Sequence, residues 1–357
     1  MFTFLLAFFS LIFLLVIHEL GHFILAKKFN VKVEEFGIFY PPRIFGKRIG
    51  ETLYSLNLLP LGAFVKVFGE REKNHPRAFG AKPAWQRALI LLGGIISFWI
   101  ISAILLSIVM GSGFSMAVED TENGNLKDTK VQIVAIAPNS PAEEAGLKLG
   151  DTITDLQVTG YNLRTTKVEQ VINFVQNHKG EEIVLKIQRG REVFDVSLVP
   201  RLSPPKEEGA MGVALMRTAT KKYSLIEAPF RGVTATFRMT YFALEGWATA
   251  LRNLVLGRPT GVELAGPVGV FSMLDEAASY SISYFLQFIA VISIYIALFN
   301  ALPIPPTDGG KLVFLFIEKI KGKEFSDKLE AKITPIFLYL LIGLVILITI
   351  RDVKKLF

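Results

Sequence analysis

The stretch His18-Glu19-Leu20-Gly21-His22 carries the pattern H-E-x-x-H. On a helix, residues i and i+4 lie on one face, so His18 and His22 can offer two imidazole nitrogens to one metal ion. The pattern is the zinc-protease signature: zinc makes a water acidic, and Glu19 can take the proton as that water attacks a carbonyl. Because short motifs also arise by chance, the alternative is a solvated helix that happens to carry two histidines.

The residues before the motif separate these two interpretations. Residues 2–17 form a predominantly apolar run that contains no charged side chain. Ionisable residues at the end of so apolar a run are costly in lipid and are by default a functional hypothesis, which favours metal ligation over chance. No Lys or Arg precedes the run and no A-x-A site follows it, so we expect a retained span rather than a cleaved signal peptide.

Composition limits the class of protein and the kind of metal site. The chain has 357 residues, 51% of them hydrophobic, and its mean hydropathy of +0.43 indicates a membrane protein with a sizeable polar part. It has no Cys, which excludes disulfides and thiolate ligands, so a zinc site must use His and carboxylate. The net charge of +7 fits nucleic acid or a membrane surface, and its distribution favours the lipid bilayer; we expect no nucleic-acid partner.

Four apolar runs predict transmembrane helices: residues 2 to about 23, 84–109 (with Gly93-Gly94), 284–302 and 335–350. A span needs about 20 residues, so the fourth run is short unless Ile333 and Thr334 join it. Lys and Arg outnumber Asp and Glu by 12 to 5 in residues 27–87 and by 6 to 4 in residues 311–332, whereas residues 110–283 hold 18 against 20. The positive-inside rule therefore places the first two segments inside, and the long middle segment and both termini outside.

Residues 27–83 contain β-prone segments. Residues 30–35 predict a strand, residues 38–49 a turn-rich hairpin, and residues 54–67 an apolar β-segment interrupted by Pro60 and Gly62. The last segment is too short and broken to span, so we expect a re-entrant β-hairpin, with an ordinary soluble strand pair as the alternative. An exposed strand edge can hold an extended peptide, so residues 59–67, with Leu59, Gly62 and Val65, are candidate substrate-binding positions.

The middle of the chain predicts a separate α+β domain at residues 128–200. Its expected elements are a strand at 131–136, a short capped helix at 140–147 that ends at Gly146, an amphipathic helix at 168–177, and strands at 182–189 and 191–199 joined at Gly190, with a Pro- and charge-rich end at 203–208. Residues 221–283 predict amphipathic helices that either lie on the outer leaflet or pack against the middle domain. The predicted divisions are 1–109, 128–200, 221–283 and 284–357.

The third span runs into a stretch that begins at Asn300, contains Pro303, Pro305 and Pro306, and reaches Asp308. Prolines break a helix, and the alternative to a functional motif is an ordinary helix end at the membrane edge. The first and third spans cross in the same direction, so His18 and Asp308 should lie at similar depth near the inner face. Zinc held by two His needs a third protein ligand if one position is to stay open for water. Asp308 is the predicted third ligand.

Together these motifs resemble the site-2 protease family of intramembrane zinc metalloproteases, in the bacterial branch that includes the regulator of sigma-E protease. The family's N-x-x-P-x-P-x-x-D-G motif matches Asn300, Pro303, Pro305, Asp308 and Gly309, with Thr307 where the family usually has Leu. Residues 54–67 resemble its re-entrant β-loop, residues 128–200 resemble a single PDZ domain, and Gly266-Pro267-Val268-Gly269 matches its G-P-x-G.

The resemblance implies that His18, His22 and Asp308 bind Zn²⁺, that Glu19 is the general base, and that Asn300 contacts the substrate backbone. It implies single-span membrane proteins as substrates, such as anti-sigma factors already cut outside the membrane, or signal-peptide remnants. We therefore expect a multi-pass protein of the inner (cytoplasmic) membrane: a polytopic α-helical membrane protein with about four transmembrane helices, a membrane re-entrant β-hairpin, and one inserted α+β PDZ-like domain on the periplasmic face.

Two other functions remain open at this point. A membrane-anchored PDZ binding protein would carry a non-catalytic metal site, but a structural zinc site is normally closed by four ligands, and three ligands plus a spare Glu favour catalysis. A transporter would also use broken helices and a carboxylate within the membrane, yet it predicts internal repeats, and the sequence has none that we can detect.

Overall fold

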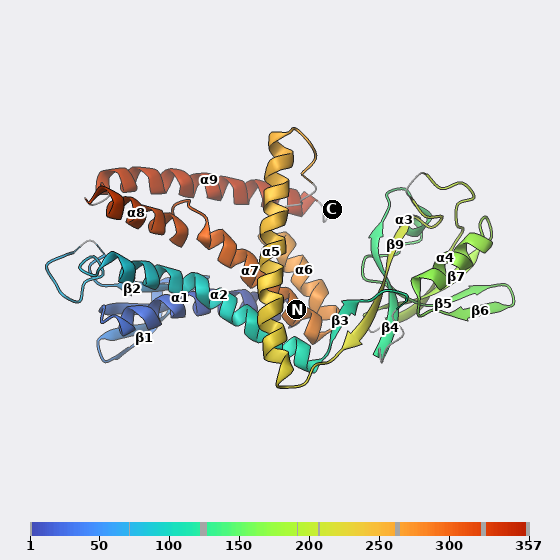
Figure 1. The fold of residues 1–357 in the computed structure, drawn as a ribbon, viewed down its shortest axis with the longest axis horizontal. Coiled ribbons are helices and arrows are strands. Elements are labelled where there is room, and N and C mark those ends of the chain that lie inside the picture. Colours follow the sequence, from blue (N-terminus) through green and yellow to red (C-terminus); the bar gives the residue numbers. More distant parts are fainter. Residues whose placement is uncertain are drawn as a thin grey trace. The chain divides into compact units, whose positions relative to one another are not determined.

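The computed structural model describes residues 2–70, 72–121, 127–190, 192–205, 208–260, 265–322 and 326–354 (Figure 1). Two compact units divide the chain. The first consists of Met1–Ile108, Pro229–Glu276 and Leu286–Phe357, and the second of Val109–Ala228 and Ala277–Phe285.

Four helices in the described part of the chain are long and apolar enough to cross a membrane, which confirms the predicted number. They are α1 (Phe2–Lys28), α2 (Ala84–Ser112), α7 (Ile282–Ala301) and α9 (Asp327–Lys354). The fourth span is longer than its apolar run of residues 335–350 because the helix continues through Pro335 into charged residues on the N-terminal side. Likewise, α1 continues past Phe23 to Lys28.

A broken connection separates α7 from α8 (Asp308–Lys321), as the prolines predicted. Two further helices, α5 (Glu227–Val255) and α6 (Pro267–Tyr280), precede α7. In Figure 1, α5 runs across the direction of α1, α2 and α9. A Cβ at Gly232 of α5 would overlap Ser107 of α2, so the two helices approach closely at this point. The aromatic side chains Phe230, Phe237 and Tyr241 of α5 are exposed, and the interfacial position of this helix stays a prediction.

The Gly266-Pro267-Val268-Gly269 motif begins helix α6. The backbone N–H groups of Gly266 and Gly269 donate to one carboxylate oxygen of Asp352, at 2.8 and 2.9 Å. Asp352 lies near the end of α9 and is buried, so its charge offsets the free N–H groups and the positive end of the α6 dipole. A Cβ at either glycine would crowd this carboxylate, which explains why the motif has glycine at both positions.

In the sequence, α1 and α2 are connected by an antiparallel sheet of two long, bent strands, β1 (Val33–Ile49) and β2 (Thr52–Val67). The first strand starts three residues later than predicted, and residues 38–49, predicted as a turn-rich hairpin, instead continue β1 as far as Ile49. Residues 35–38 of β1 pair with residues 53–56 of β2 on one side and with residues 63–66 on the other. Residues 63–67 therefore form an edge: within the described residues, no strand pairs with their other side.

The second unit is built on an antiparallel sheet in the order β3-β9-β4-β5-β7-β8, with β6 paired to β5. The strands are β3 (Phe114–Ala117), β4 (Lys127–Ile136), β5 (Thr152–Val158), β6 (Tyr161–Arg164), β7 (Ile183–Arg189), β8 (Glu192–Leu198) and β9 (Val213–Lys221). Helices α3 (Pro141–Glu144) and α4 (Val168–Asn177) cover a core that includes Ile133, Leu156, Phe174 and Leu185.

The predicted secondary structure of the middle domain agrees with these elements, but the sheet extends beyond residues 128–200. Strands β3 and β9 come from either side of that range and pair with each other, while β9 also pairs with β4. Sequence patterns did not reveal this long-range pairing. The predicted strand start at Arg191 and part of the predicted stretch 203–208 (residues 206–207) lie outside the described residues. The likeness of the unit to a PDZ domain stays a prediction.

Candidate metal centre

A close crossing of α1 and α2 positions the two histidines. A Cβ at Gly21 would overlap the carbonyl of Gly93, so the two backbones touch where both side chains are absent. One residue further, a Cβ at Gly94 would overlap the imidazoles of both His18 and His22. The glycine pair predicted within the second span thus provides the space that the histidines occupy.

Each imidazole is held by one neighbour on α2. The Nδ1 atom of His22 lies 2.8 Å from the carbonyl oxygen of Ile90 and donates to it, which leaves the lone pair of the neutral ring on Nε2. The ring of His18 stacks on Phe98, with centroids 4.8 Å apart and an interplanar angle of 20°. Phe98 is fully buried, so it fixes the plane of His18.

The third side chain comes from the start of α8. Asp308 is the first residue of that helix, and Thr307 is its N-cap: the Thr307 hydroxyl accepts from the N–H of Gly310 at 3.3 Å and lies 2.8 Å from the carbonyl oxygen of Ile304. A Cβ at Gly309 would overlap the carbonyl groups of Ala301 and Leu302. The proline break and the two glycines therefore turn the chain tightly enough to aim Asp308 back at α1, and the Thr that replaces the family's Leu provides the cap.

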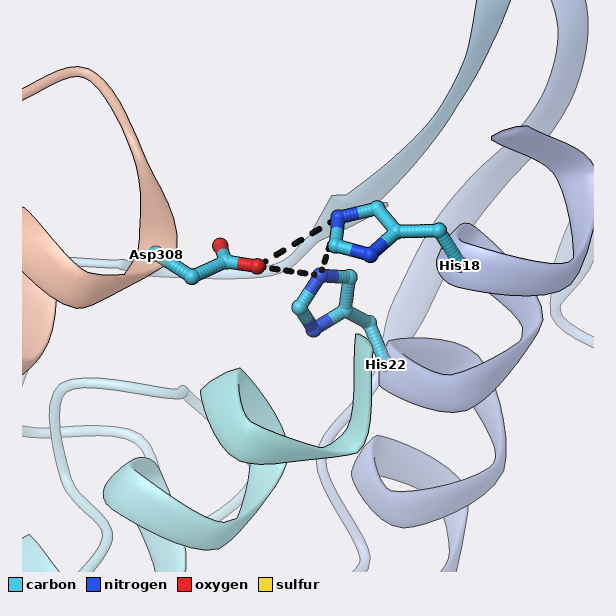
Figure 2. A group of neighbouring side chains, drawn as sticks. All are labelled: His18, His22 and Asp308. Carbon is cyan, nitrogen blue, oxygen red and sulfur yellow. Dashed lines mark hydrogen bonds and ion pairs between the residues drawn. The ribbon is translucent and has the colours of Figure 1, made fainter. Parts of the chain in front are cut away.

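Figure 2 shows His18, His22 and Asp308 converging. The Nε2 atoms of His18 and His22 are 3.2 Å apart, and Oδ2 of Asp308 lies 3.3 Å from each of these nitrogens. Donor atoms on a tetrahedral zinc at bond lengths of ~2.0–2.1 Å are about 3.3 Å apart, so the three atoms have the spacing of three corners of such a tetrahedron. Lone pairs that point at one another in a buried site repel unless a cation lies between them. The donor set therefore fits zinc with one position left open.

A pocket of about 460 Å³ surrounds these three residues. Glu19, Asn300 and Val65 also line it, so three of the remaining predicted site residues lie at the centre. The backbone N–H of Val65 is within hydrogen-bonding reach of the Glu19 carboxylate. The amide of Asn300 donates to the carbonyl oxygen of Ile296 at 2.9 Å, one helical turn earlier on α7.

The other two predicted positions, Leu59 and Gly62, are not among the residues that line the pocket. Leu59 pairs with Tyr40 in the sheet, and Gly62 has a φ of +121°, a conformation that favours glycine, with its Cα facing Leu15. They shape the hairpin next to the site. Phe64, which lies within the predicted substrate-binding stretch 59–67, also lines the pocket. Tyr40 on β1 and Lys311 on α8 line it as well but were not predicted, because no local pattern marks a residue that faces an element distant in the chain.

An ion cluster at the opposite end of the hairpin attaches it to α1. The carboxylate of Glu51 accepts from Arg77 at 2.6 Å and from Lys27, in the last turn of α1, at 2.7 Å. The hydrogen bond from Arg77 and then that from Lys27 lower the pKa of Glu51 to about 2. Since the pKa is lowered on folding, this contribution to stability is present above the ordinary carboxyl range and is lost as the pH falls towards 2.

Comparison with known proteins places the chain in a family. Residues 6–344 match peptidase family M50. The chain belongs to peptidase family M50. It is 34% identical over 345 residues to a protein of Clostridium perfringens provisionally named a zinc metalloprotease, a match that covers 95% of each chain. It is also 26% identical over 422 residues to the regulator of sigma-W protease RasP of Bacillus subtilis, again covering 95% of each chain.

Membership of M50, the site-2 protease family, confirms the resemblance drawn from the motifs. This M50 peptidase is a metalloprotease embedded in a bacterial membrane, and the names of its relatives support zinc as the metal. Membership of a peptidase family argues against both a non-catalytic PDZ receptor and a transporter.

Proposed function

We propose that this M50 peptidase hydrolyses peptide bonds within or near the transmembrane segment of single-span membrane proteins, such as anti-sigma factors or signal-peptide remnants. His18, His22 and Asp308 hold the metal, and Glu19 is the general base. The observation that carries the proposal is the convergence of three ligand atoms at 3.2–3.3 Å beside an acidic residue that is not one of them.

The chemistry follows from the residues around the metal. Zinc, when bound, supplies a Lewis acid and makes water a nucleophile near neutral pH. Glu19 accepts a proton from the attacking water and returns it to the leaving nitrogen. Because Glu19 and the ligands lie in a pocket beside apolar side chains such as Phe64 and Leu91, bulk water is partly excluded from them.

A transmembrane substrate hides its backbone in a helix, so it must be held extended before it can be cut. The open edge at residues 63–67 suits this purpose, because an extended chain can add to a sheet edge through backbone hydrogen bonds. Val65 belongs to this edge and also lines the pocket. Of the predicted stretch 59–67, the part proposed to pair with the substrate strand is therefore the open edge at residues 63–67, and Asn300, which lines the same pocket, is proposed to contact the substrate backbone.

Replacing Val65 with Pro tests this role of the edge. Pro removes the N–H at this position, which also lies within reach of the Glu19 carboxylate, and it distorts the strand, so we expect cleavage to fall by at least tenfold while zinc stays bound. Val65→Ala is the matched control because it shortens the side chain and keeps the N–H. Cleavage of a synthetic transmembrane peptide and zinc content are measured on both variants. Equal cleavage by folded Val65→Pro and wild type would remove the idea.

The protein is proposed to lie in the inner membrane with residues 110–283 on the periplasmic side and residues 27–83 on the cytoplasmic side. Single cysteines at Lys73 and Lys179 should then react with a membrane-impermeant maleimide from opposite sides of oriented vesicles. The native chain has no Cys, so the background is zero. Labelling of both positions from one side would contradict the four-span topology.

One combined measurement tests the proposed function as a whole. The purified full-length protein in detergent is expected to contain about one zinc per chain and to cleave a synthetic peptide that carries a single apolar span. A soluble peptide of equal length and unrelated sequence is the control for substrate class. A protein that binds zinc but cleaves neither peptide would favour a non-catalytic metal site.

A further inference from the structure

Tyr40 is the only tyrosine among the described residues that line the pocket of the metal centre. It lies on β1, and its side chain remains 45% exposed although it belongs to the pocket wall. Its ring lies 5.6 Å from that of Phe64, a wall residue from β2. Contact with Phe64 restricts the ring, while the residue as a whole stays partly open to the pocket.

The backbone just before Tyr40 is held in an uncommon conformation. Phe39 has a φ of +66°, a region that bulky side chains rarely adopt. The buried amide of Asn57 donates to the carbonyl oxygens of Phe39 and Ile38, at 3.0 and 3.4 Å. The pairing of β1 with β2 shifts register between Ile38 and Tyr40, as at a bulge that re-aims a side chain. Strain of this kind, maintained by buried hydrogen bonds, is characteristic of functional sites.

The pocket also keeps the phenol in its protonated form. Burial raises the pKa of Tyr40, and the negative charge of Glu19 raises it further. At neutral pH the side chain is therefore a neutral hydrogen-bond donor. Tyr40 and Glu19, the acidic residue assigned to proton transfer, line the same pocket.

Peptide hydrolysis is accelerated by such a donor. The water oxygen forms a bond to the carbonyl carbon and gives one proton to Glu19, while the electron pair of the carbonyl bond moves onto the carbonyl oxygen. The C–N bond then breaks, and the nitrogen takes the proton from Glu19. Donors directed at the oxygen where charge develops stabilise this transition state more than the ground state.

Three other side chains with donor groups that line the pocket are engaged at least in part by neighbours. Asn300 uses one N–H on Ile296, Arg87 pairs with Glu318 at 3.2 Å, and Lys311 lies 3.8 Å from Glu70. Tyr40 adds a neutral hydroxyl donor to this pocket, at a position set by the strained backbone of Phe39 and by packing on Phe64.

We propose that Tyr40 is a catalytic residue of this peptidase, whose hydroxyl donates a hydrogen bond to the carbonyl oxygen of the scissile bond as negative charge develops there. The inference rests on the proposed function of the site and deepens it by adding a residue that no motif contains.

The test compares Tyr40→Phe with Tyr54→Phe in the full-length zinc-loaded protein. Tyr54 lies in the same hairpin, with its ring 6.1 Å from Phe23 and 6.2 Å from Phe36, and it is not among the residues lining the pocket. Tyr40→Phe is expected to lower kcat by about 10²-fold, the usual loss for one such donor, with KM and zinc content unchanged. Tyr54→Phe should retain wild-type kcat.

A second readout follows the proton itself. Difluorotyrosine at position 40 carries a more acidic phenol, so the hydroxyl loses its proton, and activity falls, at a lower pH than in the wild type. The same replacement at position 54 should leave the pH profile unchanged. A merely structural role for Tyr40 would not move the alkaline limb of the profile.

The outcomes separate this inference from the proposed function. Wild-type cleavage with unchanged kcat in Tyr40→Phe would overturn the inference and leave the proposed function standing. A raised KM at unchanged kcat would also overturn it, because the phenol would then bind substrate and transition state equally. Absence of cleavage by the zinc-loaded wild type would overturn both.

Discussion

Glu19→Gln is expected to reduce cleavage of a transmembrane peptide by ~10²–10⁴-fold, the usual contribution of general-base assistance. Gln has the size of Glu and still forms hydrogen bonds, but it cannot accept the proton of the attacking water. Zinc should remain at about one per chain, since His18, His22 and Asp308 are unchanged. Zinc content by mass spectrometry and cleavage in detergent are measured on the same preparation.

Asp308→Asn provides the contrast that assigns the roles. It removes an anionic ligand, so metal affinity should fall together with activity. The expected pattern is two inactive variants, of which only Asp308→Asn has lost zinc. If Glu19→Gln lost its zinc while Asp308→Asn kept both metal and activity, the assignment would be wrong, and Glu19 itself would be the first candidate for the third ligand.

Gly94→Ala should abolish the site without changing any residue that binds the metal or the substrate. The new methyl group would overlap Nε2 of His22 and crowd the ring of His18, so neither imidazole could keep its position. Displacement of reacting groups by about 1 Å can cost ~10²-fold in rate, and we expect a loss at least this large together with reduced zinc content.

The expected loss of zinc and activity in Gly94→Ala can be distinguished from a change in the stability of helix α2. Gly→Ala within a helix normally stabilises by about 1 kcal/mol, so a change in helix propensity would act in the opposite direction. Gly343→Ala on α9 is the matched control, because a Cβ there meets nothing within 4 Å. Wild-type zinc content in Gly94→Ala would show that α2 does not hold the histidines as described.

The spans and the three candidate metal ligands were predictable from the sequence for a physical reason. Water-free surroundings exclude charged side chains, so residues such as His18 and Asp308 stand out at the ends of apolar runs. The capped helix at α3 and the amphipathic helix at α4 were predictable because turn chemistry and the 3.6-residue period are local. The length of α9 was underestimated because a helix continues through Pro335 where its apolar run does not.

Three features depended on contacts between residues distant in the chain, and local patterns did not reveal them. Pairing of β3 with β9 joins residues about a hundred positions apart. The open edge of residues 63–67 exists because residues 35–38 pair on both of their sides. The position of Tyr40 depends on Phe39, Asn57 and Phe64, none of which belongs to a recognisable motif.

By itself, the sequence determined which residues can bind a metal, that the chain is embedded in a membrane, and the family to which it belongs. These properties are set by side-chain chemistry, local spacing and hydropathy. Only the tertiary structure decided that Gly21, Gly93 and Gly94 let α1 and α2 touch, and that Asp308 comes within 3.3 Å of both histidines. The physical reason is that a metal site needs donor atoms placed to within a few tenths of an ångström, and close packing of helices distant in sequence supplies that precision.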